Sequence, residues 1–511
     1  MPENLASFKV FCQGGLNTSR DVLSQGENQP GSATALINYE PAVTGGYRKI
    51  NGFANNYGTV TGTGSVLGVC VADGINDGIF ACRTPSSGNN YLHKWNNSSS
   101  AWQAITTSGS PTMTGVTKVR FSRLNFGTPK IVLTDGINPA ATYDGSTYTQ
   151  ITHSDAPTDP KFSAIFQNHL FLAGDPAHPT KLYHSAPLAE TDFASANGAG
   201  VINVGFPIVA IKSFRNELFI FGSTNIKKLS GTALANFAVQ TVTDDLGCLA
   251  TDSVIEIGGD LLFLSQDGLR PISGTAKIGD VNLETVSKNI QSIFTDIVFD
   301  IDLDTLNAVV IRQKTQFRYF FGAADSQGII GGFRQTPNGL QFEYSQMLGI
   351  TATCAASGYI GQNEFVLHGT SDGKVHRQEQ GNSFAGENIF SIFQTPFFHM
   401  QDPEQRKIFY NVATYLRSEG DNSIVMSAVY DYEDVDTLNP TNFNLSTTGA
   451  AAFYNEALYN STAIFDGNPS PVQRTNISGS GKSASLKFVT NDTSASHSIQ
   501  GLVITFGVGD R

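Results

Sequence analysis

The chain has 511 residues, with 51 glycines, 35 phenylalanines and only 15% charged residues. This length exceeds one ordinary compact core, and a turn-rich, aromatic-rich, charge-poor composition is typical of all-β structure. The net charge of −12 excludes a protein whose affinity comes from clustered Lys and Arg that neutralise phosphates, although it does not exclude nucleic acid passing by.

Cysteine usage and hydropathy indicate the compartment. The five cysteines are scattered and never form a C-x-x-C pair, which predicts neither a disulfide framework nor a zinc site and favours assembly in a reducing cytoplasm. The N-terminus lacks a basic region followed by an apolar segment, so no signal peptide is predicted. No apolar run approaches the length of a membrane span, and we expect no membrane-spanning segment.

The first 385 residues are predicted to form an arm followed by a series of repeats. Residues 1–60 are predicted to form an extended N-terminal arm that packs along the outside of the body. Residues 61–385 contain successive units of short strands, which predict a β-propeller of about seven units. Trp95 and Trp102 flank a polar turn, so a hairpin with aromatic packing is predicted there rather than a stacking platform for bases or sugars.

The clearest repeat lies within residues 206–287. Each half contains three short apolar strands separated by polar turns and ends in Ser-Gly-Thr; the strands are expected at 209–211, 218–221 and 226–229, and again at 253–257, 261–264 and 269–272. Repetition of such a unit at a period of roughly forty residues is typical of propeller blades. Each unit is too small to bury its own face, so it must stack on its neighbours.

Three further segments complete the prediction. Residues 236–252 are polar and are predicted to project as a loop, and residues 282–297 are predicted to form one short amphipathic helix. Residues 386–511 lose the repeat and have longer strands between acidic and Asn/Thr-rich loops, which predicts a C-terminal β-sandwich-like domain. The predicted fold class is therefore all-β, a β-propeller-like body with an additional sandwich.

Motifs that resemble catalytic sites have simpler structural interpretations. Residues 369–373 match G-x-S-x-G by letter, but a Ser371 nucleophile requires a strand-to-helix turn, and a hairpin turn is expected here. Gly481-Lys482-Ser483 lacks the first glycine of a phosphate loop, because Asn476 occupies that position. Both segments are predicted to be turns.

Candidate metal ligands are also interpreted structurally. Asp300, Asp302 and Asp304 would share one face of a strand, and a solvated or lumen-facing acidic row is favoured over a calcium loop. His178 and His184 flank a proline-containing loop and are predicted to be surface-loop histidines. We therefore predict no catalytic, cofactor-binding or metal-binding residues, no cofactor and no enzymatic activity.

The central repeat carries a resemblance to a known family. The succession FRNELFIFGSTNIKKLSGT, the Gly247-Cys248 turn, GGDLLFLSQDGLRPISG and the helix start at Ser287 and Ile290 resemble the tail nozzle, or packaged-DNA-stabilisation, proteins of short-tailed bacteriophages (podoviruses). The segments INYEPAVTGGYRKINGF and GLVITFGVGDR are similar to the ends of virion proteins of that group. The resemblance is strongest over residues 206–297.

The resemblance implies a structural virion protein. Such subunits form a ring, usually a hexamer, below the head-to-tail adaptor, bear tail spikes or fibres, and continue the channel through which double-stranded DNA passes without sequence-specific binding. The ring retains the packaged genome and allows its ejection. Acidic walls would suit this role, because like charges repel phosphates at short range. Localisation in the virion tail, after assembly in the host cytoplasm, is the corresponding expectation.

Two alternatives remain open from the sequence. A β-propeller glycan-processing enzyme at the host surface would need convergent carboxylates at the propeller mouth, which sequence spacing does not identify. A receptor-binding protein would be expected to show a fibrous repeat or an aromatic-rich sugar groove. The acidic, charge-poor composition is common to all three hypotheses.

Overall fold

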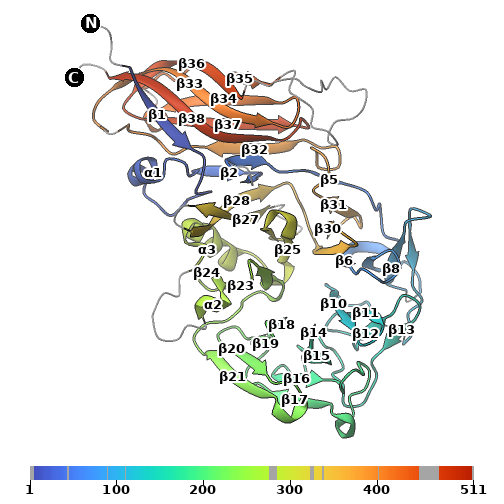
Figure 1. Cartoon of the computed structure of the whole chain (residues 1–511). Helices are drawn as coiled ribbons and strands as arrows, with labels where there is room; N and C mark the ends of the chain where they lie inside the picture. Colours follow the sequence, from blue (N-terminus) through green and yellow to red (C-terminus); the bar gives the residue numbers. More distant parts are fainter. Residues whose placement is uncertain are drawn as a thin grey trace.

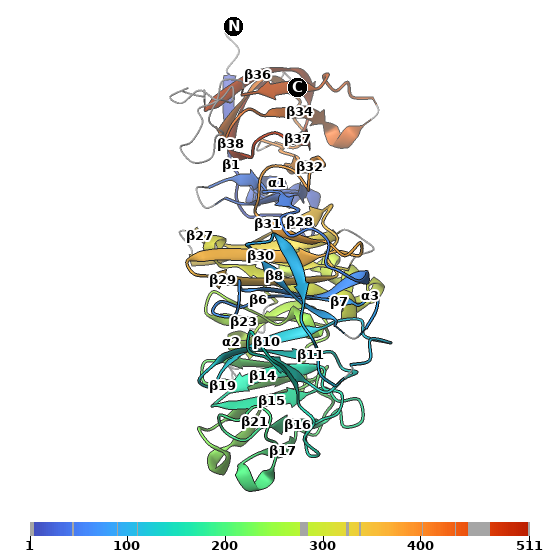
Figure 2. The ribbon, with the colours of Figure 1, turned by 90° about the vertical axis from the view of Figure 1, so that its right-hand side faces the viewer.

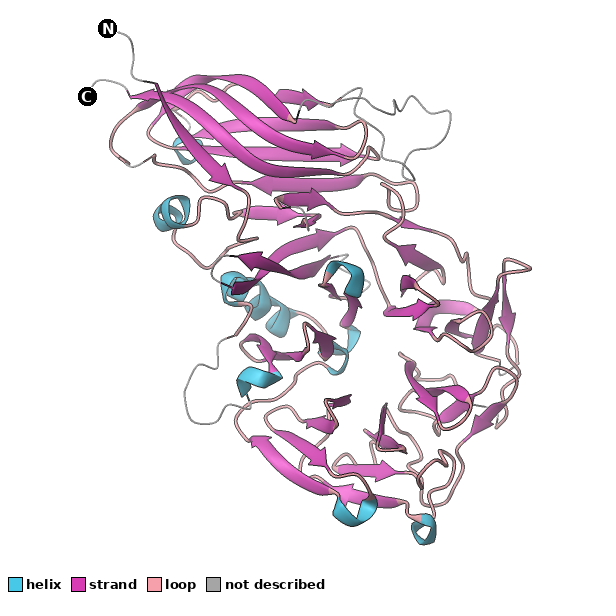
Figure 3. Cartoon of the chain, in the orientation of Figure 1, coloured by secondary structure: helices cyan, strands magenta, loops and turns pink. Residues whose placement is uncertain are grey.

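The computed structural model describes the chain apart from residues 1–4, 43–44, 89, 110, 276–284, 323–326, 337–338, 401, 435, 448–470 and 509–511. The described part is an all-β protein with a propeller body and an attached sandwich (Figures 1 and 3). Figure 1 shows the sandwich beside the rim of the propeller rather than over its centre.

Seven sheets follow one another around the propeller. Four of them are four-stranded and consecutive in the chain: β6 (Thr63–Val71) to β9 (Ala101–Ala104), β10 (Arg120–Asn125) to β13 (Tyr148–Gln150), β14 (Phe162–Phe166) to β17 (Gly200–Asn203), and β18 (Ala210–Phe214) to β21 (Ala238–Thr243). The other three are β22 (Ile255–Ile257) to β24 (Gly268–Pro271), β25 (Asn307–Ile311) to β28 (Gly339–Leu348), and β29 (Cys354–Ile360) to β31 (Val375–Gln378) with β5 (Phe53–Ala54). Neighbouring sheets bury their apolar faces against one another, as a repeat unit of this size requires.

The central repeat forms two adjacent blades. Its predicted strands are found as β18, β19 (Glu217–Phe221) and β20 (Ile226–Ser230), and as β22, β23 (Asp260–Ser265) and β24. The prediction of a loop at 236–252 is wrong, because β21 pairs with β20 as a fourth strand. The outermost strand of a blade has solvent on one side, so it is mostly exposed and its sequence lacks the apolar pattern used to find the others.

The ring is closed by a strand from the N-terminal part of the chain. Ala54 and Phe53 of β5 pair with Arg377 and Gln378 of β31, although more than 300 residues separate them in the sequence. The last blade therefore combines both ends of the propeller, and it packs against the first blade through a shared apolar cluster. This arrangement fixes the ring by main-chain hydrogen bonds as well as by packing.

The sandwich contains both ends of the chain. One sheet has the order β3 (Tyr39–Pro41), β4 (Tyr47–Lys49), β38 (His497–Val508), β33 (Lys407–Ser418) and β36 (Val472–Gly481), and β1 (Leu5–Phe11) also pairs with β38 along its whole length. Residues 5–49 are thus part of this domain, which differs from the predicted external arm. Alternate residues Phe8 and Val10 of β1 pack into or against the core, so the strand is held by burial as well as by hydrogen bonds.

The second sheet of the sandwich is continuous with a propeller blade. Its strands β2 (Ala35–Ile37), β32 (Ile389–Gln394), β37 (Ala484–Asp492), β34 (Ser423–Tyr430) and β35 (Phe443–Ser446) join β25–β28 in one nine-stranded sheet. The junction is the parallel pair of β2 and β28 at Ile37 and Gln346. One apolar cluster also runs through both domains, so they pack as one body (Figure 2).

A network of ion pairs joins the two domains. Glu40 of β3, which is 2% exposed, lies within 4 Å of cations from both domains: Arg48 at 3.2 Å, Lys314 at 2.6 Å and Arg318 at 3.6 Å. Glu379 also pairs with Lys314 and Arg318, and Glu419 pairs with Arg48. Burial opposes ionisation of Glu379, but Lys314 and Arg318 outweigh it and lower the pKa of this carboxyl to about 2. Three cations and three carboxylates therefore balance one another here.

The predicted helix and acidic row need correction. A short 3₁₀ turn at Lys288–Ile290 leads into α3 (Gln291–Asp300), whereas residues 276–284 lie outside the described part. Asp300, Asp302 and Asp304 do not form a strand, because α3 ends at Asp300 and a second 3₁₀ turn spans Leu303–Thr305. Asp302 accepts a hydrogen bond from the Asp304 backbone N–H, and this local capping replaces the expected strand pairing.

Candidate functional site: the central channel of the propeller

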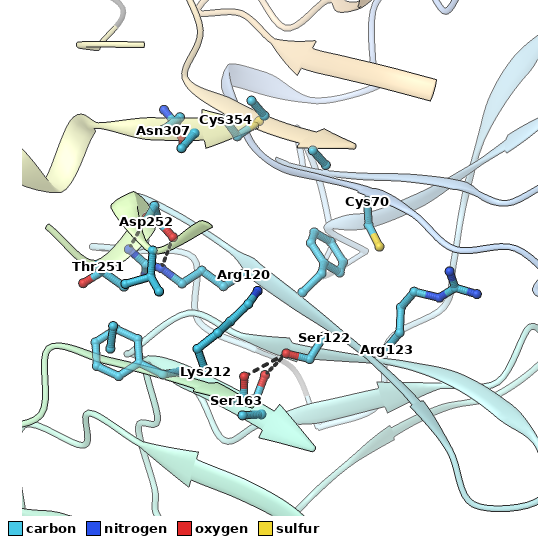
Figure 4. Close-up of a pocket in the computed structure, with 18 of the residues that line it drawn as sticks. Cys70, Arg120, Ser122, Arg123, Ser163, Lys212, Thr251, Asp252, Asn307 and Cys354 are labelled. Carbon is cyan, nitrogen blue, oxygen red and sulfur yellow. Dashed lines mark hydrogen bonds and ion pairs between the residues drawn. The ribbon is translucent and has the colours of Figure 1, made fainter. Parts of the chain in front are cut away.

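The innermost strands of all seven blades surround one polar cavity of about 610 Å³. Its walls are formed by β6, β10, β14, β18, β25 and β29, with residues 251–256 at the start of the β22 blade (Figure 4). Several lining residues have small side chains, which leave the cavity wide at those positions: Ala164, Ala210, Ala308 and Ala356. The cavity has the size of a small-molecule site.

The charge of this channel opposes that of the whole chain. Its lining contains four basic side chains and two acidic ones, namely Lys118, Arg120, Arg123, Lys212, Asp252 and Glu256. The chain carries a net charge of −12, whereas the lining therefore carries an excess of two positive charges. An enclosed wall of one sign concentrates counter-ions of the other sign.

Asp252 is held by two of the basic residues. Arg120 donates two hydrogen bonds to its carboxylate, at 3.0 and 2.8 Å, and the Lys118 ammonium donates a third at 2.7 Å. Burial opposes ionisation of Asp252, but Lys118 and Arg120 outweigh it and lower the pKa of this carboxyl to about 2. Asp252 is therefore a permanent anion that fixes the β10 and β22 blades to each other.

Lys212 has no such partner. Its side chain extends from β18 into the cavity (Figure 4), and among the described residues no carboxylate lies within ion-pair distance of its ammonium. Burial among the surrounding blades lowers the pKa of Lys212, which the more distant Glu256 only partly offsets. Lys212 is exposed to the cavity, so its low pKa reflects an enclosed space rather than a packed core.

Hydroxyl groups line the wall near this lysine. Ser122 of β10 donates a hydrogen bond to the Ser163 carbonyl oxygen at 2.8 Å, and the Ser163 hydroxyl donates to the Ser122 hydroxyl at 2.8 Å. Figure 4 shows this serine pair on the same side of the cavity as Lys212. Hydroxyls can reorient to donate to a bound acceptor, so the wall offers both charge and hydrogen-bond donors.

The motifs singled out in the sequence lie elsewhere. Residues 369–373 form the hairpin turn between β30 (Asn363–Gly369) and β31, and Asp372 pairs there with Lys374 at 2.6 Å. Lys482 lies in the turn between β36 and β37 and pairs with Glu404 at 3.1 Å. Trp95 and Trp102 are cross-strand partners with ring centroids 5.5 Å apart, which confirms the predicted aromatic hairpin.

One histidine prediction is wrong. His178 is exposed on its loop, but His184 is fully buried on β16 (Lys181–His184), where it packs against His169, Phe171 and Phe237. Burial lowers the pKa of His184, so it is a neutral core residue. The five cysteines are all free and buried. No cluster of metal-ligating side chains occurs among the described residues, and none of their helices is long and apolar enough to cross a membrane.

Sequence reasoning missed the channel. Lys118, Lys212 and Asp252 belong to three different blades and have no fixed spacing in the chain. The available signal was a charged residue within or beside an otherwise apolar innermost strand, as in Ala-Ile-Lys-Ser-Phe at Lys212. That signal becomes meaningful only when the innermost strands of successive blades are aligned.

Comparisons with known proteins do not assign a family to the chain. Neither a family model nor a curated protein sequence matches the chain significantly. Among solved structures, similarity is found to the extracellular domain of a putative hybrid two component system from B. thetaiotaomicron, with 14% identity over 70% of this chain and 42% of that one and a TM-score of 0.41. The chain therefore spans about two fifths of the length of that extracellular domain.

Two similar structures are enzymes by name. An exo-beta-1,3-galactanase from Phanerochaete chrysosporium is 12% identical over 89% of this chain and 100% of that one, with a TM-score of 0.24. An ancestral GH74 enzyme is 11% identical over 73% of this chain and 53% of that one, with a TM-score of 0.40. At these scores the similarities carry no conclusion about activity.

Proposed function

We propose that the chain is a structural subunit of a phage tail, which assembles with copies of itself into a nozzle ring below the head-to-tail adaptor. The resemblance of residues 206–297 to tail nozzle proteins motivates the proposal, and those residues include the β18–β21 and β22–β24 blades. The proposal places the protein in the virion, with tail spikes or fibres as further partners.

The size of the propeller channel bears on where DNA would pass. A cavity of about 610 Å³ has the size of a small-molecule site. A sphere of that volume is only about 10 Å across, which is less than the roughly 12 Å width of the major groove of duplex DNA alone. Duplex DNA would therefore run between copies of the chain, along the axis of the ring, and not through the centre of a propeller. The proposal thus depends on contacts between copies.

The observation that carries the proposal is an uncovered apolar face on the sandwich. Leu5 and Phe11 of β1 are 60% and 68% exposed, and Ile408 and Tyr415 of β33 are 39% and 40% exposed. The register aligns Leu5 with Ile408 across Gly507, and Phe11 with Tyr415 across Gly501, so all four lie on the same outer face. We call these four residues the outer-sheet patch. They form two groups on this face, Leu5 with Ile408 and Phe11 with Tyr415, and Ser7 and Lys9 of β1 lie between the groups. Exposed apolar side chains on an outer sheet face favour it as an interaction site.

Charge on the same face favours a second copy as the occupant. The outward positions of β1, β38, β33 and β36 include the basic residues Lys9 and Arg474 and no acid among the described residues. The chain as a whole carries a net charge of −12, so this face complements the acidic remainder of a neighbouring copy. A head-to-tail contact between two different surfaces closes into a ring when the rotation permits.

The experiment compares assembly of the wild type with a double variant. Mass photometry and negative-stain class averages of the wild type, alone and with its tail components, are expected to show rings with a central hole wide enough for duplex DNA. Phe11→Glu with Tyr415→Glu is expected to leave only monomers, because the two negative charges that each head-to-tail contact would then bury are not tolerated. Leu438→Glu, at a residue 90% exposed outside the sheet, is the control and should still form rings. A wild type that never forms a ring would overturn the proposal.

A glycan-processing enzyme or a receptor-binding protein at the host surface is the second candidate. The channel favours it, because Asp252 and Glu256 line one cavity of sugar size. Asp252 has a pKa of about 2, so it would act only as an ionised group and never as the general acid. Hydrolysis of host polysaccharide by the wild type and its loss in Glu256→Gln would establish this candidate.

A further inference from the structure

The central channel contains more positive charge than its own acids neutralise. Lys118 and Arg120 share Asp252, and the Arg123 guanidinium donates a hydrogen bond to the Asp73 carbonyl oxygen at 2.9 Å. Lys212 is the remaining basic residue of the lining, and among the described residues it has neither an ion pair nor a hydrogen bond from its ammonium. Lys212 is thus the one basic residue of the lining without a polar partner among the described residues, and one of the two excess positive charges lies on it.

The Lys212 ammonium lies in an enclosed cavity without a counter-charge from the described residues. Its attraction to water is reduced by the surrounding blades, and this burial lowers the pKa of Lys212. A bound anion would restore the lost interaction, because an ammonium forms strong charge-assisted hydrogen bonds to an anionic acceptor. Arg120 and Arg123 on the neighbouring β10 wall add to the positive potential that an anion would meet.

The wall beside Lys212 also supplies neutral hydrogen-bond donors. Ser122 donates a hydrogen bond to the Ser163 carbonyl oxygen and Ser163 donates to the Ser122 hydroxyl, across the β10 and β14 blades (Figure 4). Each hydroxyl has one proton, so it donates to a ligand by turning away from its present acceptor. An oxyanion presents several acceptor oxygens at once, so it can accept from an ammonium and from a hydroxyl together. A neutral sugar hydroxyl would leave the ammonium charge without a counter-charge.

We propose that the central channel of the propeller binds a small oxyanion, with the Lys212 ammonium as its main charged contact and the Ser122 and Ser163 hydroxyls as additional donors. The ligand class is a phosphate, sulfate or carboxylate group, either free or attached to a sugar-sized molecule that fills the remaining cavity of about 610 Å³. This proposal is independent of ring assembly and does not require catalysis.

The first test is isothermal titration calorimetry of the full chain at constant ionic strength. Inorganic phosphate, sulfate, glucose 6-phosphate and glucuronate serve as probes. Saturable binding at one site per chain is expected for at least one of them. Tighter binding of the two sugars than of the inorganic ions would identify an attached group as the ligand, and equal binding would identify a free ion.

Variants locate the site. Lys212→Met keeps the length of the side chain and is expected to weaken binding about tenfold or more, whereas Lys212→Arg should retain it. Lys181→Met, at a half-buried lysine of β16 outside the cavity, is the matched control and should bind like the wild type. Glu256→Gln removes a competing negative charge and is expected to tighten binding about twofold to fivefold.

Two outcomes would overturn the proposal. Either none of the four probes binds the wild type at millimolar concentration, or binding persists unchanged in Lys212→Met while the circular dichroism and melting temperature match the wild type. A crystal or cryo-electron microscopy structure with the tightest probe provides a check that does not depend on variants, because its density must lie beside Lys212. Density elsewhere would also contradict the assignment.

Discussion

The molecule contains two enclosed clusters of charge that differ in one respect. The network between the domains contains Glu40, Glu379 and Glu419 with Arg48, Lys314 and Arg318, and every member has an oppositely charged partner within 4 Å. The channel contains four cations and two carboxylates, and Lys212 is left without a partner. Both clusters are surrounded by protein, but only the first is neutral in itself.

The difference separates a structural role from a binding role. Removing one member of a balanced buried network leaves its partners with uncompensated charge, so such a network holds the two domains in one arrangement. A cluster with a net charge is stabilised by binding an external ion of opposite charge. Removing its surplus charged residue costs little folding stability. We therefore expect the two clusters to respond in opposite ways to the loss of a cation.

The largest effect is expected in the balanced network. Arg318 is fully buried and pairs with Glu40 and Glu379, so Arg318→Met should lower the free energy of unfolding by about 3–5 kcal/mol. Denaturant unfolding followed by tryptophan fluorescence measures it. Arg312→Met is the control, because Arg312 is half-exposed and its ion pair to Glu364 is long at 3.7 Å, and it should cost less than about 1 kcal/mol. Equal losses in the two variants would contradict the distinction.

A smaller effect is expected at Asp252. Its carboxyl has a folded pKa of about 2, below the ordinary value of 3.8, so its ion pairs contribute fully above about pH 4 and are lost as the pH falls toward 2. Asp252→Asn should lower the free energy of unfolding at pH 7 by about 2 kcal/mol.

The pH series provides the control for Asp252. The difference in melting temperature between the wild type and Asp252→Asn should shrink as the pH is lowered from 5 to 2.5. Asp304→Asn, at an exposed carboxylate that pairs with Lys161 at 3.3 Å, should show almost no difference at any pH. If the difference in melting temperature between the wild type and Asp252→Asn stays constant with pH, the charge of Asp252 is not the cause of the stability loss.

The smallest effect on stability is expected at Lys212. Because burial lowers the pKa of Lys212, its positive charge destabilises the folded chain slightly at neutral pH. Lys212→Met should therefore leave the free energy of unfolding unchanged or raise it by about 0.5 kcal/mol. Differential scanning calorimetry without added oxyanions measures this change. A decrease of several kcal/mol in the free energy of unfolding would mean that Lys212 stabilises the fold, as the members of the balanced network do.

Local patterns predicted the blades where both faces of a strand are covered. Six strands of the central repeat are predicted correctly, because the short apolar runs at 218–221 and 261–264 follow polar turns at Asn216 and Gly258-Gly259 respectively. The same reasoning failed for β21, since an outermost strand carries polar residues on an exposed edge. It also failed for Asp300 to Asp304, where local hydrogen bonding of Asp302 outweighed the alternating pattern.

Long-range pairing limited the prediction of domains. The sequence indicated a sandwich in the C-terminal part, but β1 joins it through pairs such as Leu5 with Gly507, about 500 residues apart. The pairing of β5 with β31 is another such case. No local pattern in either segment specifies its partner, because an edge strand can pair with any strand of matching register.

The sequence by itself determined the all-β class, the repeated unit and the acidic, charge-poor composition, since these follow from turn residues, short apolar runs and counts of charge. Only the tertiary structure decided how the chain ends combine and where the charges meet. Lys118, Lys212 and Asp252 come from different blades, and Glu40 reaches Arg318 across 278 positions of the chain. The first three residues meet because the ring closes, and Glu40 meets Arg318 because the sandwich packs against a blade, which the order of residues along the chain does not reveal.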